Sequence, residues 1–399
     1  MAKGQALTFI VTFGLGIALA GPGHAQNIIP LFGSPDGPTA PLYPATVPYN
    51  AQPNAGVHAI TGFDRTFGFG SSSTNTRRAD GNINQPSSPG GVFTEVNSNG
   101  HAIYIELFSP AIGALNGRGS AFPPATNLAD GGSNSTTALS GTPAGCTLNT
   151  SPAGTPANGT CTQQPQVVEF QKVFGNYRPG DIAVQWSGIN DINVSGINTQ
   201  AIANTIAATN VTNQTEMVRQ NIALGARNVV FIGLADLGTF ANFTTLKPTN
   251  NPALVSSAAL QTNAGMLPNL IALHQSTGAN IHYFDSDRFI NQIRTNPTAY
   301  GFTAAGVAVN AYGAGPASAG GFGSAAAYDA QPFNVQNQFF TPDGLHWTYR
   351  YHEWLAAAIA NQLLAPFTLA AQADLVEVTA TAFSNSMIRR LDTTAHAQW

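Results

Sequence analysis

Short apolar runs alternating with helical patterns are the feature that most constrains the fold of this chain. The runs lie at Ile182–Trp186, Asn228–Ile232 and Asn280–Phe284, and each ends near Gly, Asn or Asp. Such runs are typical of strands buried on both faces of a sheet. Because strands that alternate with helices favour parallel pairing, the sequence predicts an α/β fold with a parallel sheet sandwiched by helices.

Helical spacing is clearest towards the C-terminus. Leu355, Ile359 and Leu363 recur at i, i+4 and i+8, which predicts one apolar helix face. A second set at helical spacing follows further on: Val376, Ala380, Phe383, Met387 and Leu391.

Polar side chains follow several of the predicted strands, where the active sites of open parallel sheets lie. Asn190 and Asp191 come shortly after the strand that ends at Trp186. An Asp three residues before a His, as in Asp343 and His346, can accept a hydrogen bond from one ring nitrogen while the other faces a substrate. The alternative is an Asp that only caps the following helix.

A further short strand at Arg65–Phe69 runs into a Ser-rich segment, Gly70–Ser73. A serine there would lie beside the other two elements. Ser-rich loops are common, so this segment alone does not identify a nucleophile.

Composition narrows the possible functions. The chain has 399 residues, enough for one large decorated domain or two smaller ones. Charged residues make up only 9% of it, against about 25% in ordinary soluble domains. Its surface must therefore use Asn, Gln, Ser, Thr and Gly, which suits a protein outside the cytosol. The net charge of -4 offers no patch for phosphate backbones, so we expect no nucleic-acid partner.

The N-terminus predicts export. Lys3 precedes an apolar run from Ala6 to Ala20, and small residues lead up to Ala25. This is the pattern of a signal peptide cleaved after Ala25. The run is shorter than the roughly 20 residues that a membrane span needs, and we expect no transmembrane segment in the mature chain. The protein is predicted to be secreted, periplasmic or held at the cell surface.

The two cysteines, Cys146 and Cys161, lie within a low-complexity stretch, Gly131–Gln164. In an oxidising compartment we expect them to form a disulfide that staples this loop. The alternative is a pair of free or buried thiols. Two sulfurs without a nearby His are too few ligands for zinc.

Several common chemistries lack their motifs. The sequence has no phosphate-binding P-loop, no complete dinucleotide-binding glycine motif and no Gly-x-Ser-x-Gly nucleophile elbow. His352 and Glu353 begin like a zinc-protease helix, but no second His follows at the required spacing. We interpret this pair as a solvated helix face, and we expect neither a metal nor a cofactor.

Taken in order, the motifs resemble the SGNH, or GDSL, family of serine esterases and lipases. The resemblance implies a flavodoxin-like parallel sheet with long loop insertions, and it is nearest to the passenger domains of autotransporter esterases. The segments that carry it are Phe63–Ser72, Asn97–Gly100, Asn127–Ser133, Gly188–Asp191, Gly225–Gly238, Asn296–Gly301 and Asp343–His346.

The resemblance implies a role for each matching residue. Ser72 takes the nucleophile position, His346 the general base and Asp343 the residue that orients it. The oxyanion hole would consist of the backbone N–H groups of Ser72 and Gly132 together with the side-chain amide of Asn190. The implied substrate is a carboxylic ester: a lipid, an acetylated sugar or a polyester.

The first block departs from the family. Ser71 stands where the family has an Asp before the nucleophile. A serine can make some of the hydrogen bonds of a carboxylate, but weaker ones, so we expect Ser71→Asp to raise kcat/KM modestly. If the loop is built around a hydroxyl, the carboxylate would lack donors, and activity and stability should fall together.

A second hypothesis is a surface or binding protein that keeps the hydrolase scaffold but is catalytically weak or inactive. The altered first block and the low-complexity loop favour it, whereas the ordered motifs favour the esterase. The sequence does not indicate an oligomeric state. The predicted organisation is a signal peptide at 1–25, an N-terminal extension at 26–60, a hydrolase domain at 61–366 with an insertion at about 131–164, and a C-terminal helix and tail at 367–399.

Overall fold

The computed structural model describes most of the chain beyond residue 53. The described ranges are 54–74, 103–116, 126–129, 132–140, 165–193, 196–247, 249–307 and 330–367, with a few isolated positions between 321 and 384. The predicted signal peptide lies outside the described residues, as do Cys146, Cys161, the 97–100 segment and most of the C-terminal helical pattern. The signal peptide, the disulfide and the C-terminal helix therefore remain predictions.

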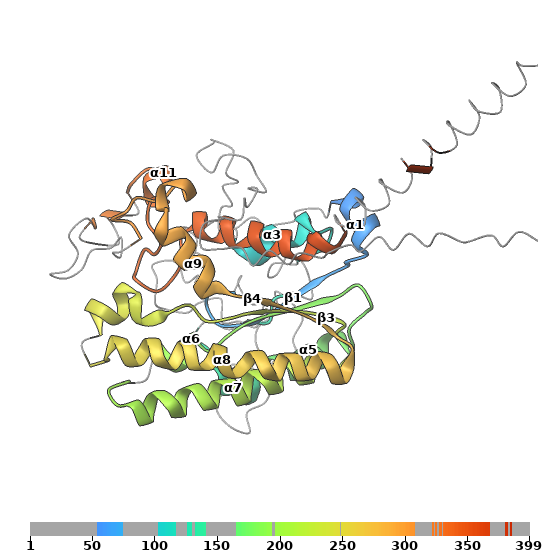
Figure 1. The fold of residues 1–399 in the computed structure, drawn as a ribbon, viewed down its shortest axis with the longest axis horizontal. Helices are drawn as coiled ribbons and strands as arrows, with labels where there is room; N and C mark the ends of the chain where they lie inside the picture. Colours follow the sequence, from blue (N-terminus) through green and yellow to red (C-terminus); the bar gives the residue numbers. More distant parts are fainter. Residues whose placement is uncertain are drawn as a thin grey trace, which may run out of the picture.

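Four parallel strands form the centre of the molecule (Figure 1). They lie in the order β1 to β4 across the sheet. The three strands predicted from the apolar runs are confirmed at their expected bounds, and the strand expected near residue 65 is β1. The strands are β1 (Thr66–Gly70), β2 (Ile182–Trp186), β3 (Asn228–Ile232) and β4 (Asn280–Phe284).

Helices cover both faces of this sheet, as the alternation predicted (Figure 1). On one face lie α5 (Gln166–Phe174), α7 (Gln200–Ala223) and α8 (Pro252–Thr277). On the other lie α3 (Tyr104–Ala111), α9 (Ser286–Thr295) and a helix at 349–367. The shorter elements are α1 (Ala55–Thr61), α4 (Ser135–Ser140), α6 (Ile189–Asn193), α11 (Phe333–Gln336), η2 (Leu237–Thr239), η3 (Asn242–Leu246) and η4 (Pro297–Tyr300).

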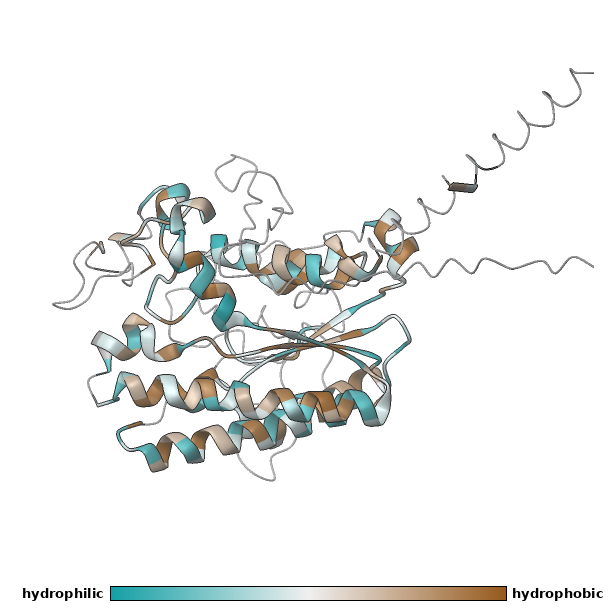
Figure 2. Cartoon of the chain, in the orientation of Figure 1, coloured by the Kyte–Doolittle hydropathy of each residue, from teal (hydrophilic) through white to brown (hydrophobic). Residues whose placement is uncertain are grey.

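The side-chain alternation of the strands divides the core into two clusters. Phe67, Phe69 and Phe231 belong to the cluster under α5, α7 and α8, whereas Val184 and Trp186 belong to the cluster under α3 and the 349–367 helix. Successive strand residues point to opposite faces, so an apolar run fills both layers. Figure 2 shows hydrophobic and hydrophilic residues mixed around α7 and α8, whose inner sides pack on the sheet.

The topology changes direction at β1. Parallel bridges join Arg65 to Leu115 and Gly68 to Asn127 on the side of β1 away from β2. The chain therefore first moves outward from β1 and then crosses back to β2, and right-handed crossovers put α3 and α5 on opposite faces. This order is flavodoxin-like, as expected. The crevice of such a sheet opens beyond the carboxyl ends of β1 and β2.

Two expectations about burial are wrong. In β4, Asn280 is exposed and only Phe284 is buried, because β4 is the last strand of the sheet. The pair His352 and Glu353 is buried rather than solvated. The ring of His352 stacks on Tyr104 of α3, and its Nδ1 accepts a hydrogen bond from the Tyr104 backbone N–H at 3.4 Å. All residues from Tyr349 to Ala360 except Ala358 are buried, so more than one face of the 349–367 helix packs inward.

The first residues of the predicted low-complexity insertion pack against the rest of the domain. Residues 132–140 include α4, which packs against α7 and contains the buried residues Ser135 and Ala138. Among the described residues, no helix combines the length and the apolar character needed to cross a membrane.

Candidate active site

Ser72 lies in the tight turn that follows β1. Gly70, the last residue of the strand, has φ 142°, and a Cβ at this position would collide with the carbonyl oxygen of Trp186 on β2. Only glycine fits there. The Thr74 N–H then donates to the Ser71 carbonyl at 3.0 Å and closes the turn. This turn brings Ser72 to the carboxyl end of the sheet, where the topology predicts a site.

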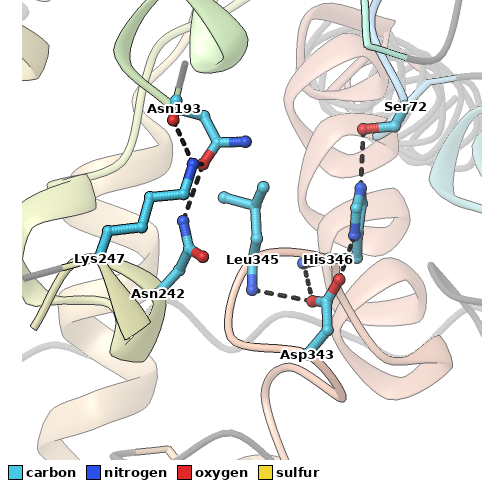
Figure 3. Close-up of polar contacts among 7 residues, drawn as sticks. All are labelled: Ser72, Asn193, Asn242, Lys247, Asp343, Leu345 and His346. Atoms are coloured by element: carbon cyan, nitrogen blue, oxygen red, sulfur yellow. Dashed lines mark hydrogen bonds and ion pairs between the residues drawn. The ribbon is translucent and has the colours of Figure 1, made fainter. Parts of the chain in front are cut away.

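Ser72, His346 and Asp343 form a continuous chain of hydrogen bonds (Figure 3). Ser72 Oγ lies 2.9 Å from His346 Nε2, and His346 Nδ1 lies 2.5 Å from Asp343 Oδ2. Since a carboxylate can only accept, Nδ1 carries the proton and Nε2 is the acceptor for the serine hydroxyl. The three side chains therefore have the geometry of a nucleophile, a base and the group that orients the base.

The loop that carries the base is held by its own carboxylate. Asp343 Oδ1 accepts the backbone N–H of Leu345 at 2.9 Å and that of His346 at 2.7 Å. One carboxylate oxygen thus fixes the backbone of the loop while the other fixes the imidazole. The spacing of three residues is what permits both contacts, because the side chain of Asp343 reaches only the next turn of chain.

Burial and pairing oppose each other in the electrostatics of Asp343 and His346. Burial favours the neutral form of Asp343, but the charge of His346 and the hydrogen bonds to it outweigh burial and hold the pKa of Asp343 below its ordinary value. Burial lowers the pKa of His346, but the charge and hydrogen bond of Asp343 outweigh it and raise this pKa above 6.5. The imidazolium is therefore stabilised, as a general base requires.

The predicted oxyanion residues lie in segments that contact each other. Asn190 is in α6, directly after β2, and its Nδ2 donates to the backbone carbonyl of Ser133 at 3.0 Å. An amide group carries two N–H donors, so this bond uses one of them. Gly132 precedes Ser133 in an exposed turn with φ 77°. The structure thus joins Asn190 to the Gly132 segment.

Asp191 has a supporting role that the motif did not predict. Its two carboxylate oxygens accept the backbone N–H and the hydroxyl of Ser135, each at 2.7 Å. Burial raises the pKa of Asp191, although both bonds act to lower it. Asp191 thereby ties the start of α4 to α6, so the two segments that carry Gly132 and Asn190 form one unit.

A polar cluster joins α6 to the loop of the base (Figure 3). Lys247 Nζ donates to Asn193 Oδ1 at 2.7 Å and also to the Asn193 carbonyl at the end of α6. Asn242 Nδ2 donates to the same Oδ1 at 2.8 Å, and its backbone N–H donates to the Gly344 carbonyl. Neither Lys247 nor Asn242 has a recognisable sequence signal, because the cluster joins three segments that are distant along the chain.

The surroundings of Ser71 differ from those that the Asp of the family would need at this position. Its side chain is completely buried, and its Oγ makes no hydrogen bond in the described part of the chain. A longer, charged side chain would have to give up its hydration at a position where the described residues offer the serine hydroxyl no partner. The structure therefore argues against the gain of activity expected from the sequence for Ser71→Asp and favours the loss.

We expect Ser71→Asp to lower kcat/KM at least about tenfold and to lower the melting temperature, because a buried carboxylate without donors costs several kcal/mol. Ser71→Ala is the matched control and should leave both quantities close to wild type, since it removes a hydroxyl that has no partner among the described residues. Enzyme kinetics and thermal melts of the two variants measure this. A gain of activity in Ser71→Asp would contradict the expectation.

Within the described residues, no group of three or more His, Cys, Asp or Glu side chains is placed to hold a metal ion. The disulfide predicted between Cys146 and Cys161 cannot be placed, because both residues lie outside the described ranges.

The sheet is flavodoxin-like, and a Ser–His–Asp chain of hydrogen bonds lies in the crevice beyond the carboxyl ends of its strands. These two features define the class of α/β proteins built like serine hydrolases. A family model described as GDSL-like Lipase/Acylhydrolase matches residues 67–359, which is well over half of the chain. The chain belongs to this family, and with it to the hydrolases of the esterase and lipase type. A search among curated proteins found no match.

Proposed function

We propose that this protein is a secreted serine hydrolase that cleaves carboxylic esters through a covalent acyl-enzyme. The observation that carries the proposal is the distance of 2.9 Å between Ser72 Oγ and His346 Nε2, with Asp343 on the far side of the imidazole. A hydroxyl becomes a strong nucleophile only when a base is placed to take its proton. A binding protein without turnover would not need this alignment.

In the first half of the reaction, Ser72 Oγ attacks the ester carbonyl carbon while His346 Nε2 takes the hydroxyl proton. Asp343 stabilises the imidazolium that forms. The tetrahedral intermediate then collapses, and the alcohol leaves with the proton that His346 returns to it. The acyl group remains bonded to Ser72.

In the second half, a water molecule replaces the alcohol. His346 takes a proton from this water, which attacks the acyl carbon, and the carboxylic acid leaves as Ser72 regains its proton. In both halves the negative charge on the carbonyl oxygen would be met by the N–H groups of Ser72 and Gly132 and by the amide of Asn190. Each such donor contributes about 2.7–4 kcal/mol in other hydrolases.

Labelling with a fluorophosphonate tests this proposal, because the reagent forms a covalent bond only with an activated serine. We expect labelling on Ser72, together with a burst of alcohol release from a chromogenic short-chain ester in amounts stoichiometric with enzyme. Purified protein that shows neither labelling nor a burst would instead favour a scaffold that binds without turnover.

The location and the natural ester belong to the same proposal. The signal-like N-terminus and the low fraction of charged residues support export to the periplasm, the cell surface or the medium. Lipids, acetylated sugars and polyesters all present the ester carbonyl that this site would attack.

A further inference from the structure

The end of β1 is held by a side chain that neither the motifs nor the proposed chemistry has used. Gln166 is the first residue of α5 and is completely buried. Its Oε1 accepts the backbone N–H of Gly70 at 2.7 Å, and its Nε2 donates to the Gly70 carbonyl at 2.7 Å. Both backbone groups of one residue, two positions before Ser72, are thus bound by one amide.

This amide takes the place of a neighbouring strand. Along the outer side of β1, Thr66 donates its N–H to the Leu115 carbonyl at 2.8 Å. Two residues later, Gly68 exchanges hydrogen bonds with the carbonyl of Thr126 and the N–H of Leu128. Alternate residues of a strand present their N–H and C=O to the same side, so Gly70 faces this side as well. There, Gln166 supplies one acceptor and one donor in place of the next backbone residue.

We propose that Gln166 is a positioning residue for the nucleophile: it fixes the peptide planes of Gly70 and thereby the position of Ser72. The Gly70 carbonyl and the Ser71 N–H belong to one peptide unit, so holding that carbonyl sets the direction in which the turn begins. Only the two rotatable backbone bonds of Ser71 separate this peptide unit from the one that contains the Ser72 N–H, and the Ser72 hydroxyl follows on the same residue. The inference rests on the proposed hydrolase function for its catalytic consequence.

A neutral amide is the group that fits this position. A carboxylate could accept from the Gly70 N–H but could not donate to its carbonyl, and an aliphatic side chain would leave both backbone groups buried without partners. The positive φ of Gly70 and its close approach to the Trp186 carbonyl restrict how far the strand end can shift towards other partners.

The test compares Gln166→Leu with Gln185→Leu. Gln185 is also a completely buried glutamine of this fold, on β2 beside Phe69, but its Nε2 donates to the Gln214 carbonyl on α7, away from the nucleophile turn. Both variants lose a buried amide. We expect only Gln166→Leu to lower kcat and the rate of fluorophosphonate labelling, by about 10- to 100-fold, with KM changed less than about twofold.

Hydrogen exchange of peptides that cover residues 67–74 provides a readout that does not depend on catalysis. Exchange there should be faster in Gln166→Leu than in wild type and unchanged in Gln185→Leu, because the Gly70 N–H loses its acceptor. If wild type is not labelled but this exchange difference appears, the hydrolase function fails while the structural role of Gln166 stands. The inference is overturned if residues 67–74 exchange at the same rate in Gln166→Leu and wild type. It is also overturned if wild type is labelled and Gln166→Leu is labelled at the same rate.

Gln166→Glu keeps the size of the side chain and serves if Gln166→Leu does not fold. A neutral Glu can accept and donate as Gln does, whereas its ionised form cannot donate. Burial raises the pKa of a carboxyl group, so the kcat of this variant relative to wild type should fall as the pH rises. A ratio that rises with pH would count against the role of Gln166.

Discussion

Ser72→Ala should lower kcat for ester hydrolysis by about a million-fold and abolish fluorophosphonate labelling. Without Oγ no acyl-enzyme can form, and only substrate binding and the oxyanion donors would remain. His346→Ala should cost about as much, because the hydroxyl at 2.9 Å then has no base. The double variant should be little worse than either single variant, since residues that act as a unit are not additive.

Ser73→Ala is the matched control for this experiment. Ser73 is the next hydroxyl along the same buried turn, so its removal tests whether the turn tolerates loss of a serine side chain. Labelling and kcat should stay within a few-fold of wild type. Labelling that survives Ser72→Ala but disappears in Ser73→Ala would move the nucleophile by one residue and refute the assignment of Ser72.

Asp343→Asn should lower kcat by about ten-thousand-fold with little change in fold. An amide at this position can donate to Nδ1, which favours the tautomer with its proton on Nε2, where it cannot accept from Ser72. The bond that now joins Asp343 Oδ2 to His346 Nδ1 at 2.5 Å is the one that sets the tautomer.

The pH dependence provides a second signature of the same substitution. His346 must be neutral to act as a base, and its pKa is raised above 6.5 by Asp343 against the effect of burial. In wild type, kcat/KM should therefore rise with pH through an apparent pKa above 6.5. In Asp343→Asn the carboxylate that raises the pKa of His346 is gone, whereas the burial that lowers this pKa remains. The residual activity should therefore rise at a lower pH than in wild type.

Profiles of kcat/KM against pH for wild type, Asp343→Asn and Asp64→Asn measure this shift. Asp64 is the control because it also lies near a histidine, 3.9 Å from His58, but at a half-exposed position at the opposite end of β1. Its replacement should leave the profile unchanged. An identical acid limb in wild type and Asp343→Asn would show that Asp343 does not set the pKa of the base.

The strands could be predicted from the sequence because their cause is local. A run such as Val229–Ile232 is apolar at every position, as expected for a strand covered on both faces, and three strands have the predicted bounds. The same reasoning was wrong for β4, because the sequence does not mark which strand lies at an edge. It was wrong again for His352, whose polar ring gave no sign that Tyr104 covers it.

The pairing of Asp343 with His346 was readable for a similar reason. The two residues are three positions apart, so the contact is made within one loop and depends little on the rest of the fold. The hydrogen bond between Ser72 and His346 joins residues that are 274 positions apart, so it depends on the whole sheet. Only the order of several motifs, by resemblance to a family, suggested it.

By itself the sequence determined the class of fold, the segments that carry the polar side chains and the residue types available for chemistry, since these follow from local apolar patterns and short spacings. The tertiary structure decided which of those residues meet and what surrounds each of them. It buried the Ser71 hydroxyl with no partner among the described residues, and it set the amide of Gln166 against Gly70 across 96 positions of chain. Contacts between distant segments depend on the register of the strands and the packing of helices over them, which no local pattern records.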